Sequence, residues 1–396
     1  MKYRSFGEKN ISLLGYGAMR FPIVEVDGTK TVDMERTEKL IDRAMEAGIN
    51  YYDTGWPYHG GNSERIIGKL LSKYPRDSYY LADKYPGHQI METYYPAEIF
   101  EAQLKKCGVD YFDFYLLHNV CDSSYDVYLD PKWGIIDYFL EEKRRGRIKH
   151  LGFSTHASVE KLSDFLEAVG DKMEFCQIQH NYLDHSLQRA EEKCALLKKY
   201  SLPIIIMEPV RGGKLANLHE SADARLKAQR PDESTASWCF RFLENIPEVL
   251  TILSGMSNEE QLEDNIKTLS GGKPLDTAET ELLYDIAEGL KASVPCTACK
   301  YCVDGCPAGL DIPTLLSVYN ELKFSNNVNS SMRVEFMPED KKPTAFIGCG
   351  KCTEICPQKI DIPKTLSTLA DMLTTAPSWR KICIERDEEQ KRNNSL

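Results

Sequence analysis

Eight short apolar runs alternate with helical patterns over the first 270 residues, and this alternation constrains the fold more than any other feature. Segments such as TEKLIDRAMEAG and VEKLSDFLEAV carry apolar residues at i, i+3 and i+4, which is typical of a helix with one buried face. The predicted strands are Leu13–Gly17, Asn50–Thr54, Tyr79–Lys84, Phe112–His118, Leu151–Ser154, Phe175–Gln179, Ile204–Glu208 and Val249–Ser254. Eight strand–helix units in about 250 residues predict an α/β protein with a (β/α)8 barrel.

An open, doubly wound sheet is the alternative that shows the same alternation. Such a sheet usually binds a nucleotide through G-x-G-x-x-G after its first strand. Gly15 and Gly17 of the first predicted strand are not followed by that spacing and a helix. The sequence therefore favours the closed barrel.

Seven cysteines near the C-terminus form two closely spaced runs. The first has the spacing C-x2-C-x2-C-x3-C and the second has C-x2-C-x3-C, each followed by proline. The first run is Cys296, Cys299, Cys302 and Cys306, and the second is Cys349, Cys352 and Cys356. Such spacing wraps thiolates around a compact 4Fe–4S cluster and is typical of bacterial ferredoxins. It predicts a small, mostly helical, ferredoxin-like domain.

Structural zinc and disulfides are the alternative uses of these thiols. Zinc sites use C-x2-C pairs separated by a longer insert, which lets the side chains form a tetrahedron. Disulfides are typical of secreted proteins, and the N-terminus has no continuous apolar segment typical of a secretory signal. The compact spacing favours iron and sulfide over both.

The two cysteine runs belong to an internal repeat. CVDGCPAGLDIPTLLS at 302–317 matches CTEICPQKIDIPKTLS at 352–367 with an offset of fifty residues. By this offset Phe346 stands where Cys296 stands in the first copy. In two-cluster ferredoxins the fourth cysteine of each run ligates the other cluster. One complete cluster is therefore predicted at Cys296, Cys299, Cys302 and Cys356.

The second set would have three thiolates, from Cys306, Cys349 and Cys352. That site could hold a three-iron cluster, recruit an outside ligand, or stay empty.

Composition and charge exclude several classes of function. The chain has 396 residues and a net charge of −11, which argues against a nucleic-acid-binding surface. No apolar stretch is long enough to span a membrane. A soluble, cytoplasmic protein is expected. The predicted parts are a barrel at 1–272, a connecting helix at 273–294, the iron–sulfur domain at 295–375 and a charged tail at 376–396, whose end at Glu385–Asn394 is expected to be frayed or disordered.

Polar residues follow several predicted strands, where a barrel carries its chemistry. The residues at these positions are Asp53, Lys84, His118, Ser154 and Gln177, with Tyr58 close behind the second strand. Each has an ordinary structural explanation alone, but their convergence on one rim suggests a site. An ammonium beside a phenol favours its ionised form, so Lys84, held by Asp53, would make Tyr58 a better general acid. His118 would donate to a substrate carbonyl oxygen.

The motifs that carry these residues resemble those of the aldo-keto reductases. The matching segments, over roughly residues 1–270, are YYDTGWPYHGGNSERIIGKLL, LADKY, DFYLLH and LGFSTH. With the cysteine runs, the chain resembles the iron–sulfur-containing branch of that family. The resemblance implies carbonyl reduction with NAD or NADP, Tyr58 as general acid, and Asp53, Lys84 and His118 in support. The cofactor contacts that it implies are Gly17, Met19, Ser154, Gln177, Met207, Arg211, Gly255 and Asn265.

Three departures from the family pattern concern the cofactor. Thr155 follows Ser154 where the family often has asparagine, and Met207 replaces an aromatic that stacks on nicotinamide. Gly255 and Gln261 stand where lysine and arginine often bind the 2′-phosphate of NADP, and Glu259 and Glu260 add negative charge. The sequence thus favours NAD over NADP, unless Arg211 compensates.

The joint action of the two parts stays open because hydride transfer moves two electrons and a cluster moves one. The first alternative is an NAD(P)-dependent carbonyl reductase with a structural or sensory cluster domain. A flavin could instead bridge the two parts. Alternatively, a ferredoxin or another redox partner could supply electrons without nicotinamide. The last alternative is a redox sensor on an inactive barrel. The substrate is expected to be a small carbonyl compound, and residues 119–133 are expected to form either a lid or a surface loop.

Overall fold

The chain divides into two compact units, and each is described by itself below. The first unit is Met1–Leu283 with Glu389–Leu396, and the second is Tyr284–Glu388. The computed structural model describes residues 1–26, 28–89, 91–122, 124–290, 294, 296, 300–324, 328–356, 358 and 360–394.

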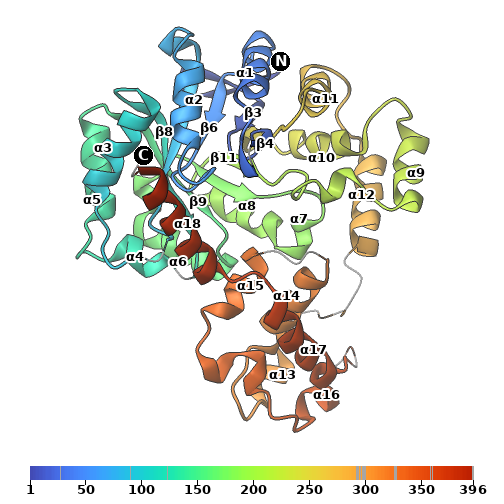
Figure 1. Cartoon of the computed structure of the whole chain (residues 1–396). Helices are drawn as coiled ribbons and strands as arrows, with labels where there is room; N and C mark the ends of the chain where they lie inside the picture. The colour runs from blue at the N-terminus through green and yellow to red at the C-terminus, as the bar shows by residue number, and fades with distance from the viewer. Residues whose placement is uncertain are drawn as a thin grey trace. The chain divides into compact units, whose positions relative to one another are not determined.

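The first unit is a closed barrel of eight parallel strands, as predicted (Figure 1). The strands are β3 (Leu14–Gly17), β6 (Tyr51–Asp53), β7 (Tyr80–Tyr85), β8 (Phe112–Val120), β9 (Ile148–Thr155), β10 (Cys176–Gln179), β11 (Ile204–Met207) and β12 (Val249–Ser254). They follow one another around the ring in chain order, and β12 pairs with β3 to close it. The open-sheet alternative is therefore wrong. Closure places the carboxyl ends of all eight strands around one mouth.

Helices surround the strands, and two hairpins accompany them. The helices are α1 (Met34–Glu46), α2 (Ser63–Leu71), α3 (Pro96–Cys107), α4 (Tyr125–Leu129), α5 (Ile135–Arg144), α6 (Val159–Val169), α7 (Asp184–Leu187), α8 (Ala190–Lys199), α9 (Glu220–Gln229), α10 (Thr235–Glu244) and α11 (Glu259–Ser270). The hairpins are β1 (Tyr3–Phe6) with β2 (Lys9–Ser12), and β4 (Ile23–Val26) with β5 (Thr29–Val32). Ile11 of the first hairpin packs in one cluster with Phe114 and Ile205 of the barrel, so this hairpin contributes to the barrel core.

Helices α2 and α3 approach each other closely at Gly68. A methyl group on Gly68 would overlap the backbone carbonyl of Cys107. This contact needs a residue without a side chain, and it fixes the distance between the two helices.

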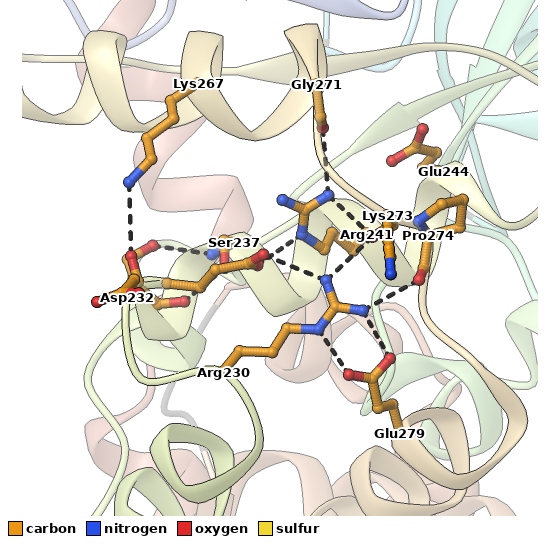
Figure 2. Close-up of polar contacts among 12 residues, drawn as sticks. Arg230, Asp232, Ser237, Arg241, Glu244, Lys267, Gly271, Lys273, Pro274 and Glu279 are labelled. Carbon is orange, nitrogen blue, oxygen red and sulfur yellow. Dashed lines mark hydrogen bonds and ion pairs between the residues drawn. The ribbon is translucent and has the colours of Figure 1, made fainter.

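Two arginines hold the segment that leaves the barrel (Figure 2). Arg230 donates to both carboxylate oxygens of Glu279 at 2.6 Å and to the carbonyls of Lys273 and Pro274 at 3.0 Å. Arg241 donates to the same Lys273 carbonyl at 3.2 Å and to that of Gly271 at 3.4 Å. The start of α12 (Thr277–Leu290) is therefore tied to the barrel by paired, charge-assisted hydrogen bonds.

The second unit is helical and reproduces the sequence repeat. Its helices are α13 (Tyr301–Asp304), α14 (Ile312–Phe324), α15 (Val328–Glu335), α16 (Lys351–Ile355) and α17 (Ile362–Thr375). The first copy begins α13 after Lys300 and the second begins α16 after Gly350, both in the left-handed conformation. Leu315 and Leu316 of α14 share one apolar core with Leu366 and Leu369 of α17.

The expectation of a frayed tail was wrong, because Trp379–Asn394 forms helix α18. Glu335 accepts hydrogen bonds from the Ser378 hydroxyl and, at 2.7 Å, from the Trp379 backbone N–H. A carboxylate at a helix N-terminus satisfies otherwise unpaired N–H groups and complements the helix dipole. The partner lies more than forty residues away, so local composition gave no sign of it.

Gly68→Ala is expected to destabilise the barrel by about 2 kcal/mol, because overpacking forces α2 and α3 apart. The matched control is Gly289→Ala in α12, where the added methyl group meets no other atom of the described residues within 4 Å and helix propensity improves. Thermal unfolding followed by circular dichroism compares the two variants with the wild type. Equal transition temperatures for Gly68→Ala and the wild type would contradict the close helix contact.

Candidate active site

A buried ion pair lies at the barrel mouth between the ends of β6 and β7. Lys84 Nζ is 2.6 Å from Asp53 Oδ2 and also donates to the Thr54 carbonyl at 2.5 Å. Both side chains are almost fully buried. Burial raises the pKa of the Asp53 carboxyl, and Lys84 opposes that rise. Burial lowers the pKa of Lys84, but Asp53 and Tyr58 outweigh this effect and raise it above its ordinary value.

Tyr58 lies beside this ion pair on the loop that follows β6. The Lys84 ammonium is 4.8 Å from the centroid of the Tyr58 ring. Gly55 lies against the ring, since a methyl group there would be 3.1 Å from its Cζ. The backbone N–H of Tyr58 donates to the Gly55 carbonyl, and its carbonyl accepts from Ser63 at the start of α2. The loop is thus closed on itself and presents the phenol to the ammonium.

His118 completes the group, and a second imidazole accompanies it. The His118 ring meets the Tyr58 ring edge-on, with centroids 5.8 Å apart. The His88 ring lies closer still to His118, with centroids 4.2 Å apart. Sequence reasoning missed His88, which is buried and comes four residues after Lys84. The sequence feature that could have indicated His88 was its place on the loop after a predicted strand.

Residues 119–133 contain the short helix α4, whose Tyr128 is buried against the mouth. The Tyr128 hydroxyl donates to the carbonyls of His118 at 2.6 Å and Tyr85 at 3.1 Å. Gly87 fits against the Tyr128 ring, because a methyl group there would come within 2.7 Å of it. This segment therefore braces the loop that carries His88 as well as the strand that carries His118.

Four further polar or sulfur-containing side chains gather at the ends of β8 to β11. Ser154 Oγ accepts from the backbone N–H of Asn119 at 2.8 Å, and Gln177 Nε2 lies 3.6 Å from the sulfur of Met207. Gln177 Oε1 and Asn119 Oδ1 are buried and have no hydrogen-bond partner among the described residues. Unpaired buried acceptors of this kind suit a carboxamide N–H donor. Asn119 was also missed by sequence reasoning.

The other candidate cofactor residues lie at the ends of β3, β11 and β12, and on α11, which carries Asn265. Asn265 donates to Ser254 Oγ at 3.0 Å, and Gly17 lies against the Ser254 carbonyl. Met19 is exposed on the loop after β3. Arg211 is buried in the left-handed conformation, with Nη1 3.5 Å from Asp184.

The surroundings of Gly255 differ from the sequence expectation in their charge. The Arg20 side chain covers Gly255, since a methyl group there would be 2.9 Å from Arg20 Cβ. Glu259 is paired with Arg36 at 2.8 Å, which lowers the pKa of Glu259. Gln261 accepts from the backbone N–H of Ser257. The negative charge of Glu259 is thus compensated, and the methylene stem of Arg20 lies over Gly255 while its guanidinium reaches toward Gly212.

The predicted cluster ligands that the structure describes all lie in the second unit. Cys299 lies outside the described residues. Cys302 and Cys352 are buried in the core of this unit, and Cys296, Cys306 and Cys356 pack against it. Cys349 is exposed, and Phe346 packs against the same core. Within the described ranges, no group of three His, Cys, Asp or Glu side chains is placed to hold a metal ion.

The backbone N–H of Leu310 points at Cys306 Sγ, 3.5 Å away, as suits a thiolate that accepts hydrogen bonds. The convergence of both cysteine runs on one core fits a cluster-binding domain.

Comparisons with known proteins agree with this geometry. Residues 13–288 match the model described as "Aldo/keto reductase family". The chain belongs to the aldo/keto reductase family. Residues 295–362 match a "4Fe-4S dicluster domain", so the reductase barrel is followed by an iron–sulfur domain. Within the described part of the chain, no helix is both long and apolar enough to cross a membrane.

Characterised aldo/keto reductases resemble the barrel over most of their length. The NADH-specific methylglyoxal reductase of Escherichia coli strain K12 is 25% identical over 305 residues, which cover 65% of this chain and 90% of the relative. The NADPH-dependent alpha-keto amide reductase of Saccharomyces cerevisiae is 30% identical over 173 residues, or 43% of this chain and 52% of the relative. Among solved structures, the holo form of aldo-keto reductase AKR11C1 from Bacillus halodurans has a TM-score of 0.59 at 25% identity and covers 72% of this chain and 96% of its own.

Lys84→Met should make stability depend more strongly on pH than it does in the wild type, in which Lys84 opposes the rise of the Asp53 pKa. Without Lys84, burial still raises the pKa of Asp53 above 3.8, so the folded variant keeps a proton that the unfolded chain releases. The free energy of unfolding of the variant should then fall as pH rises above 3.8, until the folded carboxyl itself ionises. Urea unfolding between pH 5 and 8 measures this slope.

The matched control is the double variant Lys84→Met with Asp53→Asn, which removes the buried carboxyl and should abolish the added pH dependence. If the stability of Lys84→Met alone had the same pH dependence as that of the wild type, Lys84 and Asp53 would not form an isolated buried pair.

Proposed function

We propose that this aldo/keto reductase reduces a small carbonyl compound with a nicotinamide cofactor, and that Tyr58 is the general acid. The observation that carries the proposal is the position of the Lys84 ammonium. It lies 2.6 Å from Asp53 on one side and 4.8 Å from the centre of the Tyr58 ring on the other. A phenol near a fixed cation can release its proton more readily than a free tyrosine can.

The reaction needs one proton at oxygen and one hydride at carbon. A bound reduced nicotinamide supplies the hydride with its electron pair. Tyr58 gives its proton to the carbonyl oxygen as the C–O π bond breaks, and the alcohol forms. Lys84 stabilises the tyrosinate that remains, and Asp53 keeps Lys84 charged and oriented. His118 donates a hydrogen bond to the same oxygen and aligns it with the phenol.

The residues at the ends of β8 to β11 suit the carboxamide of a nicotinamide. Gln177 Oε1 and Asn119 Oδ1 are unpaired acceptors in the described structure, and the amide of the ring carries two donors. We assign Gln177 and Ser154 to this contact and add Asn119, which supplies an amide where Thr155 departs from the family pattern. Met207 then packs against the ring through its thioether.

The names of two relatives support a proposal for the substrate class. The E. coli relative is named for methylglyoxal and the yeast relative for alpha-keto amides, both of which carry a carbonyl beside a second polar carbon. We propose a small activated carbonyl of this kind. The same relatives are named for NADH and NADPH respectively, so both cofactors belong in the first titration.

The second unit is proposed to bind one complete 4Fe–4S cluster through Cys296, Cys299, Cys302 and Cys356. Such a cluster supplies one-electron transfer. Phe346, packed against the apolar core, leaves the second set of ligands one thiolate short. A redox partner such as ferredoxin is the natural source of single electrons. If turnover requires that partner and ignores nicotinamide, the electron-transfer alternative replaces the reductase.

Tyr58→Phe should lower kcat about 1,000-fold, because general acid catalysis typically contributes 10²–10⁴-fold. Cofactor affinity, measured by fluorescence quenching, should stay unchanged, because the hydroxyl acts only in the chemical step. Tyr51→Phe is the matched control. It removes a buried hydroxyl with no hydrogen-bond partner in the described structure, on the strand that carries Asp53. Near wild-type turnover by Tyr58→Phe would remove Tyr58 from the role of acid.

Anaerobically purified protein should contain about four iron and four sulfide ions per chain if the complete site alone fills. Cys302→Ala should remove that cluster, because Cys302 belongs to the complete set. Cys383→Ala is the control, since Cys383 is buried outside both runs. About eight iron ions in the wild type would contradict a deficient second site. Carbonyl reduction that survives in Cys302→Ala would separate the barrel reaction from the cluster.

A further inference from the structure

Asp83 lies on β7, the strand that carries Lys84, and an acidic residue is unusual at its position. Strands of a parallel barrel are covered on both faces and are normally apolar outside. Side chains alternate along β7, so Asp83 points to the opposite face from Lys84, toward the helices. Asp83 is completely buried there, and so is Glu64 of α2. Two buried carboxyls directly behind Lys84 carry a large desolvation cost, and packing alone does not explain them.

Asp83 binds the backbone N–H of Lys84, and Gln103, which is held by Glu64, binds its backbone carbonyl. Asp83 Oδ1 accepts the Lys84 N–H at 2.8 Å. The amide of Gln103 on α3 donates to the Lys84 carbonyl at 3.0 Å and to Glu64 Oε1 at 3.0 Å. The Tyr115 hydroxyl donates to the oxygen of the same amide at 2.5 Å. The orientation of Gln103 is therefore determined by three groups, from α2, β7 and β8.

The charges of this cluster balance if one carboxyl carries a proton. Lys106 lies 2.7 Å from Glu64 Oε2 and forms an ion pair with it. Burial raises the pKa of Glu64, and Lys106 opposes the rise. Burial and then the charge of Glu64 raise the pKa of Asp83 well above its ordinary value. Of the two carboxyls, Asp83 has the more strongly raised pKa, because Lys106 pairs directly with Glu64.

Every element packed against Asp83 contributes to this balance. The titratable and charged groups that face it are Glu64 from α2, Lys106 and Cys107 from α3, Tyr115 from β8 and Lys84 on its own strand.

We propose that Asp83, Glu64 and Gln103 form a positioning network for Lys84, in which a neutral Asp83 donates to Glu64 and accepts the Lys84 N–H. The network rests on the proposed function, because its purpose is to hold the Lys84 ammonium against Tyr58. A neutral Asp83 also adds no negative charge behind Lys84, so Asp53 remains its counter-ion. Asparagine at position 83 reproduces this state, with an amide donor toward Glu64 and a carbonyl acceptor toward Lys84, whereas alanine removes both.

The experiment compares Asp83→Asn and Asp83→Ala in the full-length holoprotein. Tyrosine labelled with ¹³C at Cζ reports the titration of Tyr58 by NMR, and its resonance is identified by its loss in Tyr58→Phe. The matched control is Asp113→Ala. Asp113 is also a buried carboxyl on the barrel, and it accepts from Arg76 at 2.6 Å and from the Leu81 N–H at 3.0 Å. It supports the opposite end of β7.

Asp83→Ala should raise the midpoint of the Tyr58 titration by about one pH unit, because the ammonium moves away from the phenol. It should also lower kcat about tenfold or more at unchanged cofactor affinity. Asp83→Asn should behave like the wild type in both measurements. Asp113→Ala should lose stability and leave the Tyr58 titration where it was.

Three results would overturn the network. The first is a Tyr58 titration that Asp83→Ala leaves unchanged, the second is equal damage from asparagine and alanine, and the third is an equal shift in Asp113→Ala. The titration is measured without substrate or nicotinamide, so it decides the network even if the wild type reduces no carbonyl compound. Absence of nicotinamide-dependent turnover in the wild type would instead reject the proposed function.

Discussion

The buried contact between Lys84 and Asp53 is the interaction on which the rest of the active site depends. Neither charge is stable alone at this depth, since burial raises the pKa of Asp53 and lowers that of Lys84. The parallel pairing of β6 with β7 brings their carboxyl ends together, so that each charge compensates the other. The Thr54 carbonyl takes another of the three ammonium protons. The ammonium also faces the ring of Tyr58, the proposed proton donor.

The two units divide the chemistry between them. The residues proposed for carbonyl reduction all belong to the barrel, and the predicted cluster ligands all belong to the helical unit. The helical unit builds its core from two copies of one motif, and cysteines of both runs lie in or against that core. Each unit thus has its own hydrophobic core, which allows a two-electron and a one-electron site to be carried on one chain without sharing residues.

The strands and the order of the site residues could be predicted because they depend on local patterns. Apolar runs and helical periodicity gave all eight strands, and the carboxyl ends of those strands gave Asp53, Lys84 and His118. Long-range contacts escaped prediction. The contact of His88 with His118 depends on a loop braced by Tyr128, and the capping of α18 depends on Glu335. Asp83 was visible in the sequence, but its role depends on α2 and α3 packing at Gly68, which no local pattern encodes.

The cofactor region shows the same limit. Gly255 and Gln261 could be recognised as positions without a cation, and the carboxylate of Glu259 could be counted as negative charge. The pairing of Glu259 with Arg36 and the placement of Arg20 over Gly255 arise from tertiary structure. Charge counted along one segment therefore misjudges the field that a phosphate would meet.

Nicotinamide-dependent carbonyl reduction in the barrel is tested most directly by following the hydrogen that is transferred. Anaerobic protein is mixed with a carbonyl substrate and nicotinamide deuterated at C4, and the alcohol is analysed by mass spectrometry while the cluster is monitored by electron paramagnetic resonance. Direct hydride transfer in the barrel should place one deuterium at the former carbonyl carbon and leave the cluster signal unchanged. Alcohol that forms without deuterium, or only as the cluster is oxidised, would contradict this mechanism.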